Sequence, residues 1–420
     1  MGCISSMYGI GKKKKKTIRE VSVFIPCLRI PVQSDMHKIP RALIPKDLAH
    51  RITSLRNQIV LVSHSTGGSA ITELTKSLEE YLSLLLGLTS KEHGLQELVE
   101  FRWKELEDGR QVSCVQNSWF ELLSVLHMMA MLTLMEANLK LIPKESALSE
   151  RLVSPDCMRD AVDLLLKAAG YLNFCIHNVL IRLPTDIKNK LPSVMQGSFL
   201  DAISHQALAQ GTEVQLGLAV QSKNATLSVK RRLACEQLNF FAKAYNFCLS
   251  EVNAKDGAAA SKKQLLFIKW KHLEAKAAAY YYHGLILDKC TEPSSHVSAM
   301  CCFLAAEELL VESKKACLTF CLAEPTTRAS PPWGAMKHLH KKIPETAMKK
   351  SQMYGCILEQ DKGLKKLPEL PEFQLSLKPD EYELPEVDSG WDSGKWEIPV
   401  PAVQTTLKEH LNDPDHQPQT

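Results

Sequence analysis

The chain has 420 residues, 45% of them hydrophobic and 23% charged, so we expect a large globular core. Its 13 cysteines contain no C-x-x-C pair, so we expect no disulfide framework, metal or other cofactor. The net charge of +4 divides into a basic body and an acidic tail, because residues 367–420 hold 12 Asp or Glu against 3 Lys. No zinc-finger spacing or RNA-recognition motif accompanies the basic body, so we expect an anionic membrane or an acidic partner and no nucleic acid.

Residues 1–20 form a basic leader with the pattern of a lipidated N-terminus. Gly2 and Ser6 fit the M-G-x-x-x-[ST] pattern for N-myristoylation, and Cys3 is placed for S-palmitoylation. A single myristoyl chain gives only marginal membrane binding, so the basic run that follows would add attraction to anionic lipid. This run consists of Lys12, Lys13, Lys14, Lys15 and Lys16. The alternative is a disordered basic leader without a function.

The stretch Val21–Ile30 is apolar and interrupted by Pro26, which is typical of a short strand or the edge of a hairpin. An opening helix is predicted over Arg41–Ile59, with its start signal at Pro45.

The stretch Ile59–Ala70 contains the run Ser-His-Ser-Thr-Gly-Gly, which resembles the nucleophile elbow of an α/β-hydrolase with Ser65 as the nucleophile. Ser63 stands where that motif requires its first glycine, and the segments that follow are almost wholly helical and not alternating strands and helices. We therefore interpret this stretch as a loop between two helices and keep a lipase or esterase using Ser65 as the alternative.

Apolar residues recur at helical spacing through most of the remaining chain. The predicted helical segments are Ile71–Leu88, Leu95–Leu106, Trp119–Leu141, Asp156–Leu183, Ser198–Glu251, Ser261–Lys289 and Ser294–Cys321. Gly87 is expected to end the first of them. Trp119–Leu141 is the most apolar, but Glu121 and His127 within it favour a buried core helix over a transmembrane one, with His127 a core histidine and not a ligand. Helix pairs joined by short loops indicate a solenoid of the tetratricopeptide type.

The segment Ser261–Lys289 is the centre of this predicted array. Its apolar residues fall at alternating steps of four and three, and Ala275, Ala277, Ala278, Ala279 and Gly284 make the helix thin in its middle. A thin helix lets another backbone approach closely, so we expect an inner helix.

The chain contains, in this order, the runs AISHQALAQGTEVQLGLAV, KWKHLEAKAAAYYYHGL and AAEELLVESKKA. Together they resemble the Bro1-domain family of endosomal-sorting proteins, which includes the yeast Bro1 and human Alix proteins. The resemblance covers residues 21–366 and is closest in plan to the short form of the family, in which no second domain follows. It implies a mainly α-helical solenoid with a small N-terminal β-sheet.

The resemblance also implies a function and a site. Members of the family act as non-enzymatic adaptors that bind the C-terminal amphipathic helix of an ESCRT-III subunit of the Snf7 (CHMP4-like) type. By position, the exposed apolar patch that receives this helix would contain Leu216, Val229 and Leu233, with Arg231 and Arg232 at its rim. Gln215 competes with Leu216 for its place, and the alternative is that these apolar residues belong to the core.

Residues 367–420 contain eight prolines and many acids without a sustained period, which is typical of an extended or disordered tail. Its aromatic residues suggest the hypothesis that the tail folds back over the basic body and covers the proposed patch.

Together these features predict a lipidated, non-enzymatic adaptor at the cytoplasmic side of endosomal or plasma membrane, with a cytosolic pool. Besides the hydrolase, a lipid-anchored scaffold without a sorting role remains an alternative.

Overall fold

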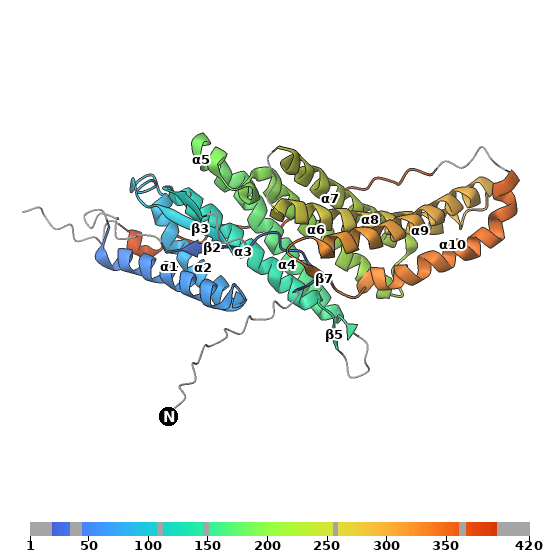
Figure 1. Ribbon diagram of the computed structural model, residues 1–420, viewed down its shortest axis with the longest axis horizontal. Coiled ribbons are helices and arrows are strands. Elements are labelled where there is room, and N and C mark those ends of the chain that lie inside the picture. The colour runs from blue at the N-terminus through green and yellow to red at the C-terminus, as the bar shows by residue number, and fades with distance from the viewer. Residues whose placement is uncertain are drawn as a thin grey trace, which may run out of the picture.

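The computed structural model describes residues 19–33, 44–106, 112–145, 151–254, 259–360 and 367–392. Helices stacked side by side form an elongated body, with the first helices at one end and the last at the other (Figure 1). The helices are α1 (Lys46–Thr66), α2 (Ile71–Thr89), α3 (Ser118–Leu141), α4 (Pro155–Phe174), α5 (Thr185–Lys190), α6 (Gly197–Gln221), α7 (Leu227–Ala254), α8 (Ala259–Leu287), α9 (Pro293–Leu322) and α10 (Gly334–Gln360). The helix α4 continues through a π turn, η2 (Cys175–Val179), and a 3-10 turn, η3 (Leu180–Arg182), and two further 3-10 turns are η4 (Ser193–Met195) and η5 (Ser389–Trp391). The strands are β1 (Arg19–Val21), β2 (Arg29–Val32), β3 (Phe101–Glu105), β4 (Val112–Val115), β5 (Lys144–Glu145), β6 (Arg151–Leu152) and β7 (Thr327–Ala329).

The predicted mainly α-helical fold is confirmed. Successive long helices pack on one another from α6 to α10, and α10 also returns to pack on α6. The helix α8 is the expected inner helix, since Ala275, Ala277 and Ala279 are fully buried. Gly284 lies so close to α9 that a β-carbon there would come within 2.8 Å of the Phe303 ring. The small residues of α8 therefore set the spacing between these two helices.

The predicted small N-terminal sheet is present. Strand β2 pairs antiparallel with β3, which pairs antiparallel with β4, whereas β1 pairs in parallel with the distant β7. The helix predicted over Leu95–Leu106 is wrong, because Phe101–Glu105 is a strand. There Phe101 and Trp103 are buried and Arg102 between them is exposed, the alternation of an extended segment.

The hydrolase alternative is wrong, because Ser65 lies in the last turn of α1 and not on an elbow after a strand. Its hydroxyl donates to the carbonyl of Val62, 3.2 Å away. Gly67, with φ of 59°, ends the helix in the left-handed conformation. The sheets in the described part of the chain have two or three strands each, so they do not form the wide central sheet that the hydrolase requires.

The buried carboxylate of Glu121 joins three helices to the sheet. It accepts from the Arg56 side chain of α1 at 2.9 Å, from the Tyr81 hydroxyl of α2 at 3.2 Å and from the Trp103 indole of β3 at 2.6 Å. Arg56 also donates to the carbonyl of Val32 in β2 at 2.8 Å. Removing Arg56 or Glu121 would leave the charge of the remaining side chain buried and uncompensated. These contacts therefore fix how α1, α2, α3 and the sheet pack together at the N-terminal end of the body.

Three described segments are long and apolar enough to cross a membrane by length and composition: α3, Pro155–Arg182 and α9. In α3, 78% of the most apolar window is buried inside the fold, against 39% in α9. The prediction of a buried core helix therefore holds for α3, whereas α9 exposes much of its apolar surface.

His127 lies in the centre of α3, fully buried, and neither ring nitrogen has a hydrogen-bond partner among the described residues. It is a core histidine as predicted, but an unsatisfied one. Burial lowers the pKa of His127 from 6.5 to about 3, and the nearby Arg29 guanidinium acts in the same direction. The folded protein therefore keeps this imidazole neutral where the unfolded chain would protonate it.

This difference predicts a loss of stability in acid. Between pH 6.5 and about 3 the unfolded chain binds a proton at His127 that the folded chain does not, so the free energy of unfolding falls as the pH falls. Each pKa unit of difference is about 1.4 kcal/mol. Urea unfolding of His127→Leu at pH 7 and pH 4.5 should show a shallower loss than the wild type. The exposed control His50→Leu should behave as the wild type, and an unchanged slope in His127→Leu would contradict the assignment.

Candidate docking surface on helices α6 and α7

The predicted patch lies at the start of α7, where the loop from α6 reverses direction. The hydroxyl of Thr226 accepts from the backbone N–H of Val229 at 3.3 Å and so caps the first turn of α7. Val229 is 46% exposed, and Leu233, one turn later on the same face, is half-buried. These two apolar side chains are the part of the predicted patch that solvent reaches.

Leu216 does not belong to this exposed patch. It is fully buried in α6, in one core cluster with Ala277 and Phe303. The cause is the position of α6, which packs against α4, α7 and α10 and therefore hides most of its surface. Its neighbour Gln215, the competing candidate, is half-buried. The alternative that Leu216 is a core residue is thus the correct one.

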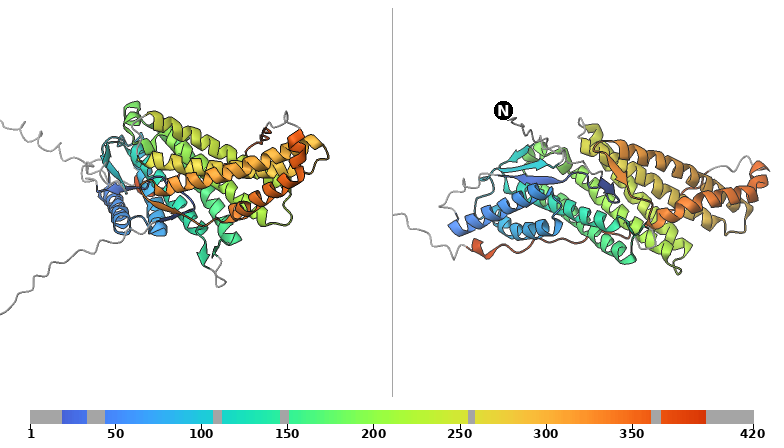
Figure 2. Two further views of the ribbon diagram at one scale, coloured as in Figure 1. Left: turned by 45° about the vertical axis from the view of Figure 1, so that its right-hand side comes forward. Right: turned by 60° about the horizontal axis from the view of Figure 1, so that its bottom comes forward.

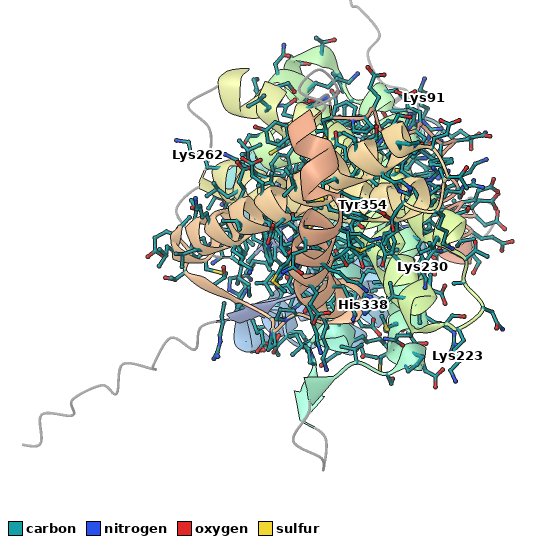
Figure 3. All side chains as sticks on the ribbon, turned by 90° about the vertical axis from the view of Figure 1, so that its right-hand side faces the viewer. Lys91, Lys223, Lys230, Lys262, His338 and Tyr354 are labelled. Atoms are coloured by element: carbon teal, nitrogen blue, oxygen red, sulfur yellow. The ribbon has the colours of Figure 1, made fainter. Side chains whose placement is uncertain are left out.

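Basic side chains surround the start of α7. Lys223 and Arg232 are exposed and Lys230 is half-buried. Figure 3 shows Lys223 and Lys230 on the same end-on face of the molecule as His338 of α10. Burial, together with the charges of Lys342 and Lys230, lowers the pKa of His338 below its ordinary value. The region therefore carries a positive potential that suits an acidic ligand.

The chain's own residues 367–392, named here the strap, run along this surface. The ring of Phe373 lies 5.7 Å from the Arg231 guanidinium carbon. The Ser376 hydroxyl accepts from Arg232 at 2.8 Å, and the Ser376 backbone N–H donates to Glu236 at 3.1 Å. Arg232 in turn pairs with Glu236 at 2.8 Å. Both predicted rim arginines are therefore in contact with the strap.

Residues 367–392 of the predicted extended or disordered tail are extended and packed on the body, as the fold-back hypothesis expects. Figures 1 and 2 show its last part, η5, beside α1 and α2, at the end of the body opposite to the end of α10. Midway, the Tyr382 ring packs edge-on against Tyr171, with ring centroids 4.7 Å apart. Asp388 pairs with Arg51 of α1 at 2.7 Å. The strap thus crosses the body from α7 to α1.

Trp391 anchors the far end of the strap. It is only 4% exposed, and its indole N–H donates to the carbonyl of Leu84 at 2.9 Å. A β-carbon at Gly87 would lie 2.1 Å from this ring, so the glycine makes room for it. Gly87 was predicted to end α2, but the helix continues to Thr89, and the glycine serves the strap instead.

The sequence contains a signal for the strap that its prolines and acids obscure. Phe373, Leu375 and Leu377 are half-buried, and the residues between them, Gln374 and Ser376, are exposed. This alternation of apolar and polar residues is typical of an extended segment packed on one side.

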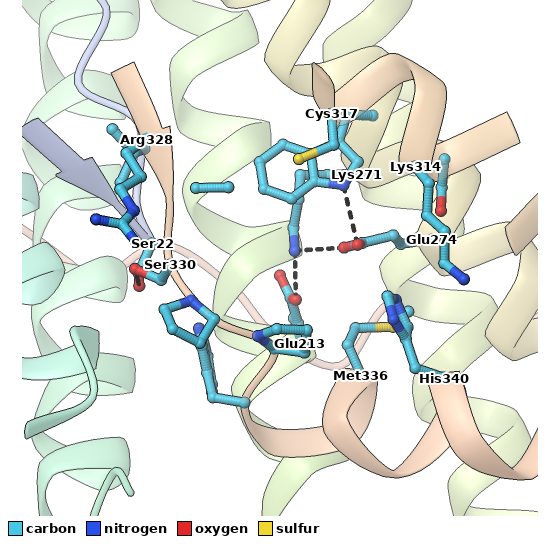
Figure 4. A pocket seen from close by; sticks show the side chains of 17 residues that line it. Ser22, Glu213, Lys271, Glu274, Lys314, Cys317, Arg328, Ser330, Met336 and His340 are labelled. Atoms are coloured by element: carbon cyan, nitrogen blue, oxygen red, sulfur yellow. Dashed lines mark hydrogen bonds and ion pairs between the residues drawn. The ribbon is translucent and has the colours of Figure 1, made fainter. Parts of the chain in front are cut away.

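A cavity of about 400 Å³ lies between α6, α8, α9 and the segment around β7. Figure 4 shows Lys271 between two carboxylates, with Glu213 at 2.6 Å and Glu274 at 2.7 Å. Burial alone would lower the pKa of Lys271, but the two carboxylates raise it above its ordinary value, so it stays an ammonium ion. The group joins α6 to α8 and sets two acids against one ammonium, and burial raises the pKa of the Glu213 carboxyl above its ordinary value.

The lipidation residues Gly2 and Cys3 and the basic run Lys12–Lys16 lie outside the described residues, as do residues 393–420. The structure therefore shows where the residues of the predicted partner patch lie and leaves the predicted membrane site as a sequence expectation.

Solved structures with the same arrangement of helices show what the fold is similar to. A structure titled "ALIX BRO1 CHMP4C complex" aligns with a TM-score of 0.62 and 17% identity, covering 88% of this chain and 97% of that one. Another, "Structure basis for endosomal targeting by the Bro1 domain", aligns with a TM-score of 0.54 and 16% identity, covering 89% and 95%. At these identities the likeness concerns the fold alone.

Sequence comparison finds relatives described as "BRO1 domain-containing protein BROX". The protein of Danio rerio is 28% identical over 252 residues, which span 58% of each chain, and that of Pongo abelii is 24% identical over 341 residues, which span 76% of this chain and 75% of the relative. The BRO1-like domain family matches residues 10–351. This chain therefore belongs to the BRO1-like domain family.

Proposed function

We propose that this chain is a non-enzymatic adaptor that binds the C-terminal amphipathic helix of an ESCRT-III subunit at the start of α7. The observation that carries the proposal is the exposed Val229 beside the half-buried Leu233, set among basic side chains. Family membership and the fold shared with a structure titled as a complex with CHMP4C support the choice of ligand.

The contacts available at this surface favour a weak interaction. Full burial of one Val or Leu side chain contributes about 1.5–3 kcal/mol, and here one of the two is already half-buried. The basic rim would act mainly on the association rate and on the choice of an acidic peptide. A weak site is sufficient where many copies of the ligand helix are assembled on one membrane surface.

The sequence pattern of the leader supports attachment to the same surface. Myristate on Gly2, with palmitate on Cys3 or the basic run Lys12–Lys16, provides the two signals that stable anchoring needs. We therefore infer a location at the cytoplasmic side of endosomal or plasma membrane, with a cytosolic pool. Anchoring raises the local concentration of the adaptor near membrane-bound ESCRT-III.

An acidic residue in the patch should weaken docking. Val229→Asp and Leu233→Asp each place a charge where an apolar contact is expected, so the Kd for a labelled ESCRT-III C-terminal helix, measured by fluorescence anisotropy, should rise at least about tenfold, or about 1.4 kcal/mol. Leu61→Asp on the exposed face of α1 is the matched control and should bind as the wild type. Equal affinity of all three variants would remove the patch from the proposal.

The strap should compete with the ligand helix, because it contacts the rim arginines. Phe373→Ala removes the ring from Arg231 and should raise the affinity for the same peptide several-fold. Tyr382→Ala weakens the strap away from the patch and should have a smaller effect. Deletion of residues 367–420 that leaves the affinity unchanged, in a protein that is still folded by circular dichroism, would contradict the competition.

Lipidation is tested separately. Gly2→Ala removes the acceptor of the myristoyl group, so the protein should move from the membrane fraction to the cytosol without a change in its circular dichroism. Persistence on membranes would count against the anchor. If Gly2→Ala releases the protein but the patch variants bind as the wild type, the chain is a lipid-anchored scaffold without an ESCRT role.

A further inference from the structure

The outer face of α9 is an apolar stripe without a partner in the described part of the chain. Leu304, Val311, Leu318 and Leu322 recur at steps of seven, seven and four, which places them on one side of the helix. Their side chains are between 45% and 67% exposed. The remaining faces of α9 pack on α8, α10 and β7. A stripe of this length on a well-formed helix indicates an interaction surface.

Four charged residues along this stripe are placed symmetrically about Val311, and a fifth, Glu312, is exposed directly after it. Leu304 precedes it by seven residues, and Leu318 follows it by seven. Two acids, Glu307 and Glu308, lie four and three residues before Val311, and two bases, Lys314 and Lys315, lie three and four residues after it. Glu307 is half-buried and the other three are exposed, with Lys314 at the edge of the stripe, where it also lines the cavity near His340. None of the four forms a salt bridge with another described residue.

We propose that α9 docks against α9 of a second copy of this chain, antiparallel and with the two-fold axis at Val311. In this arrangement Val311 meets Val311, and Leu304 of each copy lies opposite Leu318 of the other. Each pair of glutamates then lies opposite a pair of lysines across the interface. A two-fold axis brings the same patch of both copies together, so the pattern has to be complementary to itself, as this one is.

The same charges exclude the other pairings. If the two helices ran parallel and in register, glutamates would face glutamates and lysines would face lysines, and like charges at short distance are destabilising. A neutral ligand helix would leave all four charged side chains without a partner, and a uniformly charged one would leave half of them. The stripe is therefore fitted to a second copy in one direction.

A pair of single helices forms a small interface. Interfaces below about 1,200 Å² belong to weak or transient complexes, so the dimer should form in the micromolar range and depend on protein concentration and salt. This inference does not rest on the proposed function. If both hold, the dimer would present two α7 patches together, which would strengthen binding to an assembled polymer.

Sedimentation velocity of the full chain over a micromolar concentration series tests the inference. The wild type should shift from monomer to dimer with rising concentration. Val311→Glu should stay monomeric, because it places two like charges at the axis, whereas Leu61→Glu, an exposed leucine on α1, should dimerise as the wild type. All these residues are exposed, so folding should be unaffected, which circular dichroism checks.

Exchanging the charges of the α9 stripe provides the decisive test of the proposed dimer. The double variant Glu307→Lys, Glu308→Lys gives the stripe four lysines, with Glu312 the one acid left among them, and Lys314→Glu, Lys315→Glu makes it wholly acidic, so each alone should remain monomeric. An equimolar mixture of the two should form a heterodimer at least as stable as the wild-type dimer. A wild type that stays monomeric throughout the series, or a mixture that fails to associate, overturns the proposal. If Val311→Glu instead lowers binding of the monomer to anionic lipid vesicles, the stripe is a lipid-facing surface and the proposal is likewise overturned.

Discussion

The ammonium group of Lys271 holds the centre of the helical array together. It lies between Glu213 of α6 and Glu274 of its own helix α8, in a region where each of the three side chains is less than a tenth exposed. Breaking such a group by removing one partner typically costs about 3–5 kcal/mol, because a charge is left buried without compensation. The register of α6 against α8 is thereby specified, and α7 and α9 pack on α8 from either side. The exposed faces of α7 and α9 both take their positions from this one arrangement.

The spacing of apolar residues in the sequence was sufficient to predict the helices that are buried in the same way along their whole length. The inner position of α8 follows from its small residues, since Ala277 and Gly284 permit a close neighbour whatever that neighbour is. Short segments whose pairing partner is distant were harder to predict. Phe101 and Trp103 alternate with an exposed residue as in a strand, but the run is too short to stand out among helical segments. Its pairing with β2 is a contact with a strand far away in the sequence, which a local pattern does not contain.

The residues of the candidate site divide in the same way, into those whose exposure the sequence could predict and those whose exposure depends on the assembled fold. Val229 and Leu233 are accessible where the resemblance indicated, whereas Leu216 is buried because three helices surround α6. Surface and core leucines do not differ in spacing, so only the assembled array could separate them. The strap was expected only as a hypothesis, drawn from the aromatic residues of the tail, because its prolines and acids outweighed the short alternation around Phe373. Composition describes a whole segment, and packing can be determined by a few of its residues.

The attachment of the strap is graded along its length. Its middle is held by ring contacts such as Tyr382 with Tyr171, which salt does not screen, but Arg51, which holds Asp388 near the end, is more than half exposed. Ionic strength therefore weakens the ion pair of Asp388 with Arg51, whereas the buried Trp391 beyond it still holds this end of the strap. A protease or antibody that reaches the α1 end of the strap would act on the same segment that contacts Arg231 at the α7 end. An event at one end of the molecule would therefore be mechanically connected to the other end without a change in the helices between them.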